Sequence, residues 1–230
     1  KTCCSLSDVE DARSVATRLN VPFYVMNYEQ EFEEKVIRKF VAEYQEGRTP
    51  NPCIDCNRYM KFDHLFQQGL SLGCDVIVTG HYASVRYNEQ TQKYELAKGV
   101  DPSKDQSYVL YSLSQEQLAH IQFPLGSYTK EQIREIAIEH EFLNAKKPDS
   151  QDICFVEGGD YGSVIQQYTG NAITEGIFID CQGNRLGTHQ GYYHFTIGQR
   201  RGLGIAAAQP LYVIEIRPES NQVVLGQIED

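Results

Sequence analysis

The segment that most constrains this chain is GRTPNPCIDCN, residues 47–57, in which two prolines precede two cysteines. Each proline restricts its own φ and disfavours helix in the residue before it, so we expect a stiff, extended entry. The next residues, RYMKFDHLF, have the periodicity of an amphipathic helix, which predicts that a helix begins at Cys56 or Asn57. The positive end of that helix stabilises a thiolate, so Cys56 is a candidate reactive cysteine.

A C-x-x-C pair has two other common uses, as half of a zinc site or as the redox pair of a thioredoxin-like helix. A structural zinc site needs two more ligands, usually as a second close pair, and no such pair follows here. A thioredoxin pair directly follows a first strand, whereas a long predicted helix precedes this one. Reactive chemistry and metal binding therefore remain equally compatible with this segment.

The composition is that of a globular protein of a reducing compartment. With 230 residues, 41% of them hydrophobic, the chain is long enough for one sizeable core and a small second domain. Seven cysteines, an odd and unevenly spaced set, indicate free thiols, so we expect a cytoplasmic protein. No apolar run reaches transmembrane length and no signal-peptide pattern opens the chain, so we expect no membrane partner.

The net charge of −10 argues mildly against a nucleic-acid partner, but phosphate contacts require only a local basic surface. Three basic pairs are candidates for such a surface: Arg58 with Lys61, Lys146 with Lys147, and Arg200 with Arg201. Each pair alone is more typical of a solvated face.

Predicted helices and strands alternate over the first 80 residues. Apolar residues recur at helical spacing up to Asn20 and again over residues 29–46, while Val21–Asn27 and Cys74–Thr79 are apolar runs typical of buried strands. This order predicts an α/β fold with a parallel sheet whose ligands bind beyond the carboxyl ends of the strands. Gly80 and His81 follow such a strand. Glycine admits a close ligand and histidine can donate to a phosphate or base, although a solvent-capped histidine is equally common there.

The middle of the chain carries shorter signals. Residues 83–87 and 94–98 flank a polar loop and predict a hairpin, and Lys104–Tyr108 form a polar turn after it. Ser114 with Gln117, and Thr129 with Gln132, have the spacing of capping boxes and predict two helix starts.

Cys154 lies in a second basic, proline-bearing loop, KKPDSQDICF. Its polar setting differs from that of Cys74, which we expect in the core, and makes Cys154 the natural third thiol beside Cys53 and Cys56. From residue 158 glycine and tyrosine become frequent and short β-like runs appear, so we expect domains of residues 1–157 and 158–230. The β-like runs are residues 177–180, 211–216 and 222–225.

Several segments together resemble one family, the bacterial tRNA-specific 2-thiouridylases. They are GRTPNPCIDCN, KFDHL, VTGHYA, KDQSYVLYSL, AKKPDSQDICF and GTHQGYYHFTIGQRRGLGI, in this order over essentially the whole chain. The resemblance implies an incomplete Rossmann-like, adenine nucleotide α-hydrolase-like domain followed by a small β-rich central domain. The family's SGGxDS pyrophosphate loop and its C-terminal barrel are not found, so we expect a fragment.

The resemblance also implies roles for single residues. Cys56 matches the nucleophile and Cys154 the cysteine that bears a persulfide, whereas Asn51, Pro52 and Cys53 match the loop that touches the target base. Gly80 matches a nucleotide contact, and His81, Lys104, Asp105 and Gln106 match tRNA contacts. We add Arg200 and Arg201 as candidates for the tRNA backbone.

The implied reaction is ATP-dependent, with Mg²⁺, and takes place on the wobble uridine of tRNA. ATP adenylates the C2 oxygen, a persulfide on Cys154 delivers sulfur, and Cys56 frees the sulfide or closes a disulfide with Cys154. A sulfur-relay protein or a cysteine desulfurase is the implied donor. The base must leave the anticodon stack, which suits a rigid Asn-Pro platform.

Two alternatives remain open. The best-described members of that family carry Asp at the position of Cys53, so three thiols here, Cys53, Cys56 and Cys154, are also candidate ligands for a [4Fe–4S] cluster with one open iron. A non-catalytic RNA-binding module with structural zinc at the same thiols is the alternative from another class of protein.

Overall fold

The structure is a computed structural model that describes residues 6–148, 153–170 and 174–227. The chain divides into two compact units, one of residues 1–35 with 53–155 and one of residues 36–52 with 156–230. The domain boundary expected between residues 157 and 158 stays a prediction. Within the described residues, no helix is both long enough and apolar enough to cross a membrane.

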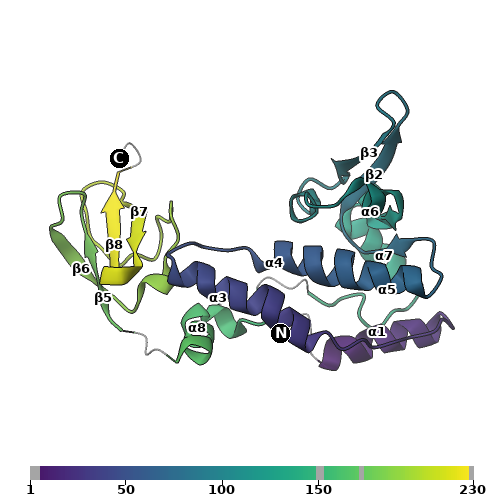
Figure 1. The fold of residues 1–230 in the computed structure, drawn as a ribbon, viewed down its shortest axis with the longest axis horizontal. Helices are drawn as coiled ribbons and strands as arrows, with labels where there is room; N and C mark the ends of the chain where they lie inside the picture. Colours follow the sequence, from purple (N-terminus) through teal and green to yellow (C-terminus); the bar gives the residue numbers. More distant parts are fainter. Residues whose placement is uncertain (1–5, 149–152, 171–173, 228–230) are drawn as a thin grey trace. The chain divides into compact units, whose positions relative to one another are not determined.

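The first unit opens with helix α1 (Leu6–Arg18), as the helical spacing predicts (Figure 1). The strand expected over Val21–Asn27 is wrong, because these residues pair with no described strand and leave Val21, Tyr24 and Val25 more than half exposed. An apolar run becomes a strand only where a neighbouring strand accepts its backbone hydrogen bonds.

The helix expected over residues 29–46 is confirmed as three consecutive helical segments. These are α2 (Glu29–Phe32), a π-helical segment η1 (Glu33–Ile37) and α3 (Arg38–Gln45). Phe40 and Tyr44 of α3 are buried in the second unit, where their rings meet edge to face at 4.9 Å. Gly47 follows with φ of +73°, a conformation that glycine adopts readily and that ends the helix.

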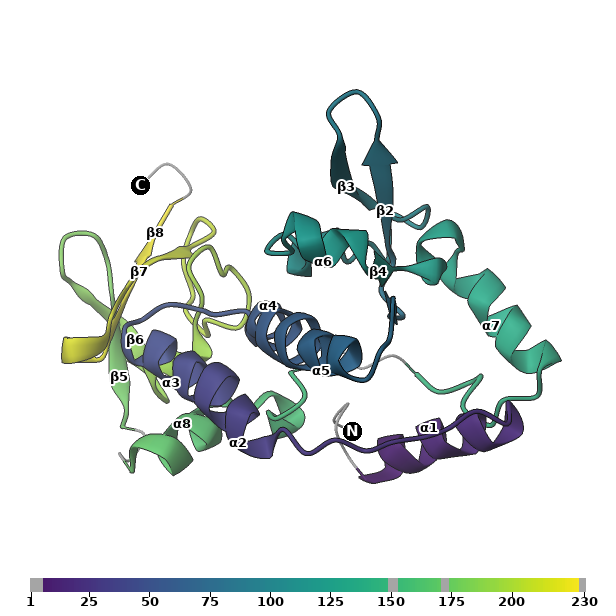
Figure 2. The same ribbon diagram turned by 45° about the vertical axis from the view of Figure 1, so that its right-hand side comes forward.

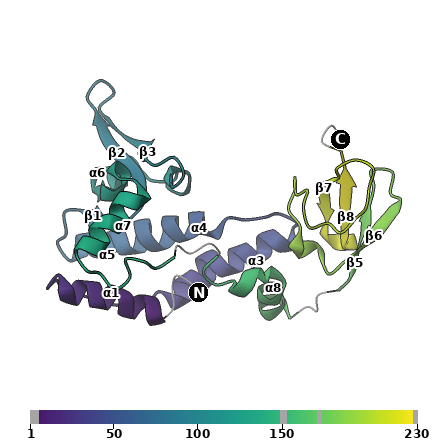
Figure 3. The same ribbon diagram turned by 180° about the vertical axis from the view of Figure 1, so that it is seen from behind.

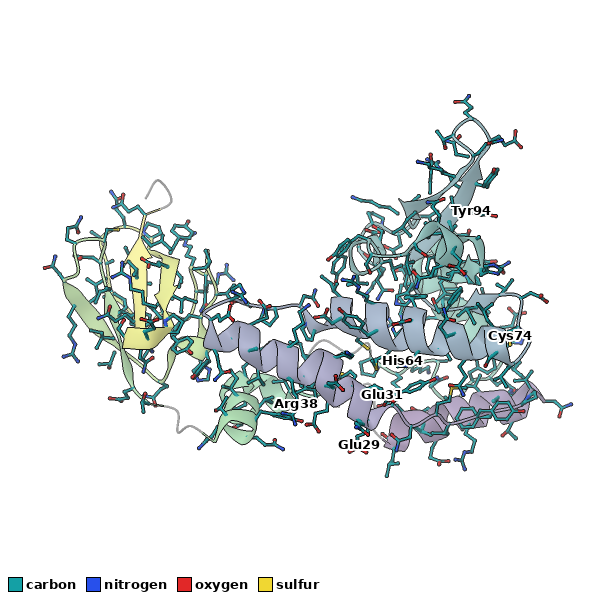
Figure 4. The ribbon with its side chains drawn as sticks, in the orientation of Figure 1. Glu29, Glu31, Arg38, His64, Cys74 and Tyr94 are labelled. Atoms are coloured by element: carbon teal, nitrogen blue, oxygen red, sulfur yellow. The ribbon has the colours of Figure 1, made fainter. Side chains whose placement is uncertain are left out.

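The first unit contains a short parallel pair of strands, of which β4 (Ile121–Gln122) is labelled in Figure 2 and β1 (Ile77–Val78) in Figure 3. Strand β1 pairs with β4, which confirms a parallel sheet, although β1 is shorter than the expected run over residues 74–79. The expectation that Cys74 is buried is wrong. Cys74 belongs to the turn that ends the preceding helix, where its N–H donates to Gly69, and it is exposed (Figure 4).

The hairpin is confirmed, and so are both capping boxes. Strands β2 (Ala83–Asn88) and β3 (Lys93–Lys98) pair antiparallel. Ser114 caps α6 (Gln115–Ala119) and Thr129 caps α7 (Lys130–Glu139), each with its glutamine reaching back. Two short 3₁₀ segments complete this part, η3 (Ser107–Val109) and η4 (Pro124–Ser127). The core between these elements consists of Phe62, Phe66, Ile77, Ala83, Val109, Leu110, Ile121 and Phe123.

The second unit is rich in β-structure, as the composition predicts. Its four-stranded sheet has the order β6-β5-β8-β7, with β5 and β8 parallel and the outer pairs antiparallel. The three expected runs are confirmed, whereas β6, with only one large apolar residue, was not expected. The strands are β5 (Gly176–Ile179), β6 (Arg185–His189), β7 (Tyr212–Arg217) and β8 (Gln222–Gly226); the helical segments are η5 (Glu157–Gly159), α8 (Tyr161–Thr169), η6 (Tyr192–His194) and η7 (Pro218–Ser220).

Candidate functional site

The two cysteines of the C-x-x-C pair lie inside a helix rather than in a loop before it. Three consecutive segments, α4 (Pro52–Asp55), η2 (Cys56–His64) and α5 (Leu65–Ser71), run as one helix (Figure 1). The expected start at Cys56 or Asn57 is wrong, because Pro52 occupies the first helical position, where its fixed φ favours helix and its missing N–H costs nothing. Cys53 is therefore in the first turn and exposed, and Cys56 is in the second turn and half-buried.

The middle of this helix is π-helical over nine residues, from Cys56 to His64. The π-helix is rare and occurs mostly as single turns, frequently at functional sites. Its hydrogen bonds join residues five apart, so Lys61 follows Cys56 by one turn. Asn57, which is 5% exposed, donates from Nδ2 to the carbonyl of Cys53 at 2.9 Å and so links the two cysteine turns.

The carboxyl end of β1 carries Gly80 and His81, and the two differ in exposure. Gly80 is exposed, whereas His81 is only 6% exposed and packs against the rings of Phe62 and Phe123, each 5.8 Å away. Its Nδ1 lies 2.7 Å from Thr79 Oγ1. Burial, and then the charge of Lys61, lower the pKa of His81 to about 4, so the ring is neutral at pH 7.

The Lys104–Gln106 turn is held against the same strand end. Gln106 accepts from the Tyr82 N–H through its side chain at 3.1 Å and donates from its own N–H to the Tyr82 carbonyl at 2.9 Å. Asp105 accepts from the Ser107 hydroxyl at 2.8 Å and from the Gly99 N–H at 3.3 Å. The structure therefore brings this turn next to His81, with the Asp105 and Gln106 side chains engaged inside the protein.

The loop before Cys154 is fixed near both of its described ends. Lys147 donates to Asp8 and Asp11 of α1, and Phe155 meets Phe32 edge to face at 5.8 Å. Cys154 is half-buried, and its neighbours at 149–152 lie outside the described residues. The basic loop predicted here is thus tied to α1 and α2 by an ion-pair cluster and a ring contact.

Arg200 and Arg201 belong to the second unit and are both exposed. They precede Gly202 and Gly204, which have φ of +79° and +67°, a left-handed backbone that glycine adopts without strain. Asn51, which is exposed, and Pro52 also fall within the residues of this unit.

The described residues do not form a ligand set for either of the two metal-bound alternatives. Among residues 6–148, 153–170 and 174–227, no three His, Cys, Asp or Glu side chains lie together as a ligand set. A [4Fe–4S] cluster or a structural zinc needs at least three such ligands around one point. The described thiols are therefore not arranged as ligands of one iron–sulfur cluster or one zinc ion.

Comparison with known proteins decides the family. Residues 1–158 match the family described as tRNA methyl transferase HUP domain, and residues 162–227 match the tRNA methyl transferase PRC-barrel domain. The chain belongs to this family. The HUP domain is the Rossmann-like nucleotide α-hydrolase fold, so the fold class expected from the sequence is confirmed.

Several relatives in this family are named tRNA-specific 2-thiouridylase MnmA. The protein of Carboxydothermus hydrogenoformans is 53% identical over 99% of this chain and 62% of its own length. That of Clostridioides difficile is 50% identical over 99% of this chain and 63% of its own length, and that of Acetivibrio thermocellus 53% over 97% and 62%. The chain thus spans less than two thirds of the length of these relatives.

Sequence reasoning missed one candidate residue of the family's HUP domain. Lys61 was noted only as half of a basic pair with Arg58, whereas its Nζ lies 3.4 Å from His81 Nε2. The spacing of five residues between Cys56 and Lys61 is the signal that could have identified Lys61, but only if a π-helix had been predicted there.

Proposed function

We propose that this chain carries the catalytic cysteines of a tRNA-uridine 2-sulfurtransferase, which replaces the C2 oxygen of the wobble uridine with sulfur. The observation that supports this most is the identity of about half of all residues, over nearly the whole chain, to proteins named tRNA-specific 2-thiouridylase. The HUP fold supports ATP as the co-substrate that activates the uridine.

Cys154 carries the transferable sulfur as a persulfide, loaded by a sulfur-relay protein or a cysteine desulfurase. ATP, bound with Mg²⁺, supplies the adenylyl group that turns the C2 oxygen into a leaving group and releases pyrophosphate. The terminal sulfur of the Cys154 persulfide then forms a bond to C2, and AMP leaves with the former C2 oxygen.

Cys56 completes the transfer. Its thiolate attacks Sγ of Cys154, the bond between Sγ and the transferred sulfur breaks, and that electron pair leaves with the sulfur of the new 2-thiouridine. The order can also be reversed, with Cys56 first releasing hydrosulfide, which then attacks C2. Both orders leave a Cys56–Cys154 disulfide, so a dithiol reductant is needed to reset the enzyme. Partial exposure of both thiols is compatible with this exchange.

The remaining residues serve binding in this proposal. Asn51, Pro52 and Cys53 contact the extruded base, and Gly80 contacts the nucleotide. His81, Lys104, Asp105 and Gln106 belong to the tRNA-binding region at the strand end and its turn, and Arg200 and Arg201 contact the tRNA backbone.

The test follows radiolabelled sulfur into tRNA with the protein extended to the full length of its relatives. ATP, a sulfur donor and a dithiol reductant are present, and the parent is compared with Cys56→Ser and Cys154→Ser. Cys74→Ser is the matched control, because Cys74 is exposed beyond the end of the same helix. We expect incorporation by the parent and the control and none by the other two variants.

Other results lead elsewhere. Incorporation that survives both Cys56→Ser and Cys154→Ser contradicts the roles proposed for these thiols. No incorporation by a parent that binds zinc stoichiometrically, with loss of folding in Cys56→Ser, supports the RNA-binding module instead. Iron and acid-labile sulfide in active, anaerobically prepared protein support the cluster-assisted route.

A further inference from the structure

Lys61 is a half-buried cation whose hydrogen-bond partner is an uncharged ring. Its Nζ lies 3.4 Å from His81 Nε2, and no carboxylate of the described residues forms an ion pair with it. An ammonium group can only donate, so Nε2 must be the acceptor. The other ring nitrogen, Nδ1, then carries the proton and donates to Thr79 Oγ1 at 2.7 Å.

The His81 ring is fixed in this tautomer and orientation. It packs against Phe62 and Phe123, and both of its nitrogens are engaged, one as donor and one as acceptor. A ring that is buried and doubly hydrogen-bonded has no free nitrogen for a ligand. The group available to a ligand at the strand end is therefore the Lys61 ammonium group, which His81 holds in place.

Several other cations of this unit form ion pairs with carboxylates. Lys147 binds Asp8 and Asp11, Arg18 binds Glu141, and Arg86 binds Glu95. The chain has 31 acidic and 21 basic residues, so carboxylates are abundant. A partly buried cation is normally paired, because removing it from water is costly without a counter-charge. The missing counter-charge at Lys61 therefore points to an anionic ligand.

The position of Lys61 suits a nucleotide phosphate. The lysine lies on the helix that contains Cys56, one π-helical turn further on, and His81 fixes it at the carboxyl end of β1. In parallel α/β sheets, ligands bind beyond this end of the strands. Gly80, next to His81, is exposed, and a Cβ built there meets only Leu125 Cδ1, at 3.6 Å, so the backbone is open to a ligand.

We propose that Lys61 binds a phosphate oxygen of a nucleotide ligand, and that His81 is a positioning residue that holds the ammonium group in place. The ligand class rests on the proposed function, since both tRNA and ATP present such oxygens. In this arrangement His81 does not touch the ligand itself, because Lys61 makes the contact.

Equilibrium binding to the full-length protein tests this in two arms. One arm measures affinity for an unmodified tRNA transcript without ATP at several KCl concentrations, and the other measures affinity for a non-hydrolysable ATP analogue with Mg²⁺ and no tRNA. For an RNA phosphate, Lys61→Gln makes the negative slope of log affinity against log salt shallower by about one. For an ATP phosphate, Lys61→Gln weakens binding of the ATP analogue by roughly tenfold, as expected for one lost charged contact, and leaves the salt slope of tRNA binding unchanged.

Matched variants separate binding from structure. Lys61→Arg retains the charge and keeps parental binding, and Lys35→Gln removes an exposed lysine paired with Glu34 and changes neither arm. His81→Phe keeps the ring packing but removes the acceptor, so it weakens binding of the same ligand as Lys61→Gln does. His81→Gln supplies an acceptor again and retains much of the parental binding. Parental slope and parental ATP affinity in a folded Lys61→Gln protein overturn the proposal.

The outcome is independent of sulfur incorporation. If the parent does not thiolate tRNA but Lys61→Gln still reduces the salt slope or the affinity for the ATP analogue, the proposed function is contradicted and this inference stands. If the parent thiolates tRNA and Lys61→Gln binds both ligands as the parent does, the proposed function stands and this inference is contradicted.

Discussion

Lys61 and Lys147 are both partly buried lysines of the first unit, and their surroundings are opposite. Lys147 donates to Asp11 and Asp8, and these hydrogen bonds raise the pKa of its ammonium group. Lys61 donates to a neutral imidazole and keeps its charge unbalanced. In a chain of net charge −10, a lysine between carboxylates ties two segments together, whereas a lysine on a neutral acceptor retains its charge for an external anion.

The largest effect is expected from acid, because protonation of His81 lowers the stability of the protein and removes the neutral acceptor of Lys61. The pKa of His81 is about 4 in the folded protein against 6.5 ordinarily, so between these values the unfolded chain binds more protons. The stability contributed by the neutral ring is fully present above pH 6.5 and is lost as the pH falls through 4, up to roughly 3 kcal/mol. Protonated His81 also faces the charge of Lys61 and can no longer accept its hydrogen bond.

Urea unfolding of the parent and of His81→Phe between pH 7 and pH 4 measures this effect. Carboxylates elsewhere contribute to both proteins, so the difference between the two curves isolates His81. We expect the parent to lose more stability than the variant over this range. Parallel curves would show that His81 is not held neutral.

The next largest effect is expected from the hydroxyl that fixes the His81 tautomer. Thr79→Val keeps the side-chain shape but leaves the buried Nδ1–H without its acceptor, a loss of about 2 kcal/mol. Thr17→Val is the control, because its hydroxyl bonds the exposed Arg13 carbonyl. Denaturant unfolding should show a clearly larger loss for Thr79→Val, together with weaker binding in the arm affected by Lys61→Gln. Equal losses of stability in the two variants would show that the Thr79 hydroxyl does not stabilise the His81 ring.

A smaller effect on stability separates the two lysines directly. Lys147→Met leaves Asp8 and Asp11 close together without their cation, so stability falls at low salt and recovers in 1 M NaCl as screening increases. Lys61→Met removes a cation with no carboxylate partner and leaves His81 Nε2 without its donor, so any loss of stability is the same at both salt concentrations. Thermal unfolding at two salt concentrations compares them. A salt-dependent loss in Lys61→Met would reveal an ion pair there.

Features of the fold that depend on neighbours in sequence could be predicted. Hairpin β2–β3 needs only a polar loop between two alternating runs, and the boxes at Ser114 and Thr129 are complete within four residues. Val21–Asn27 has an equally apolar sequence but forms no strand, because a parallel strand depends on a partner far away in the chain. Cys74 was misplaced for a similar reason, since the turn after α5 governs its exposure rather than its apolar neighbours.

The candidate site was predictable as a set of segments but not as a geometry. Motifs brought Cys56, Cys154, Gly80 and His81 to notice, yet the pairing of His81 with Lys61 spans 20 residues and depends on how η2 packs against β1. Nor did the sequence reveal that Pro52 starts the helix, which places Cys53 in its first turn. Such features arise from tertiary packing, which the local periodicity of a sequence does not report.

The smallest effect is expected when Lys147 is made to resemble Lys61. Asp8→Asn with Asp11→Asn removes both carboxylates that neutralise Lys147, while either change alone leaves one. If pairing rather than position keeps Lys147 from binding anions, the double variant gains a little affinity for tRNA and a slightly steeper salt slope, and each single variant stays at the parental value. The same tRNA titration measures this. Parental affinity in the double variant would mean that the location of Lys61 at the strand end, and not its missing counter-charge alone, suits it to a phosphate.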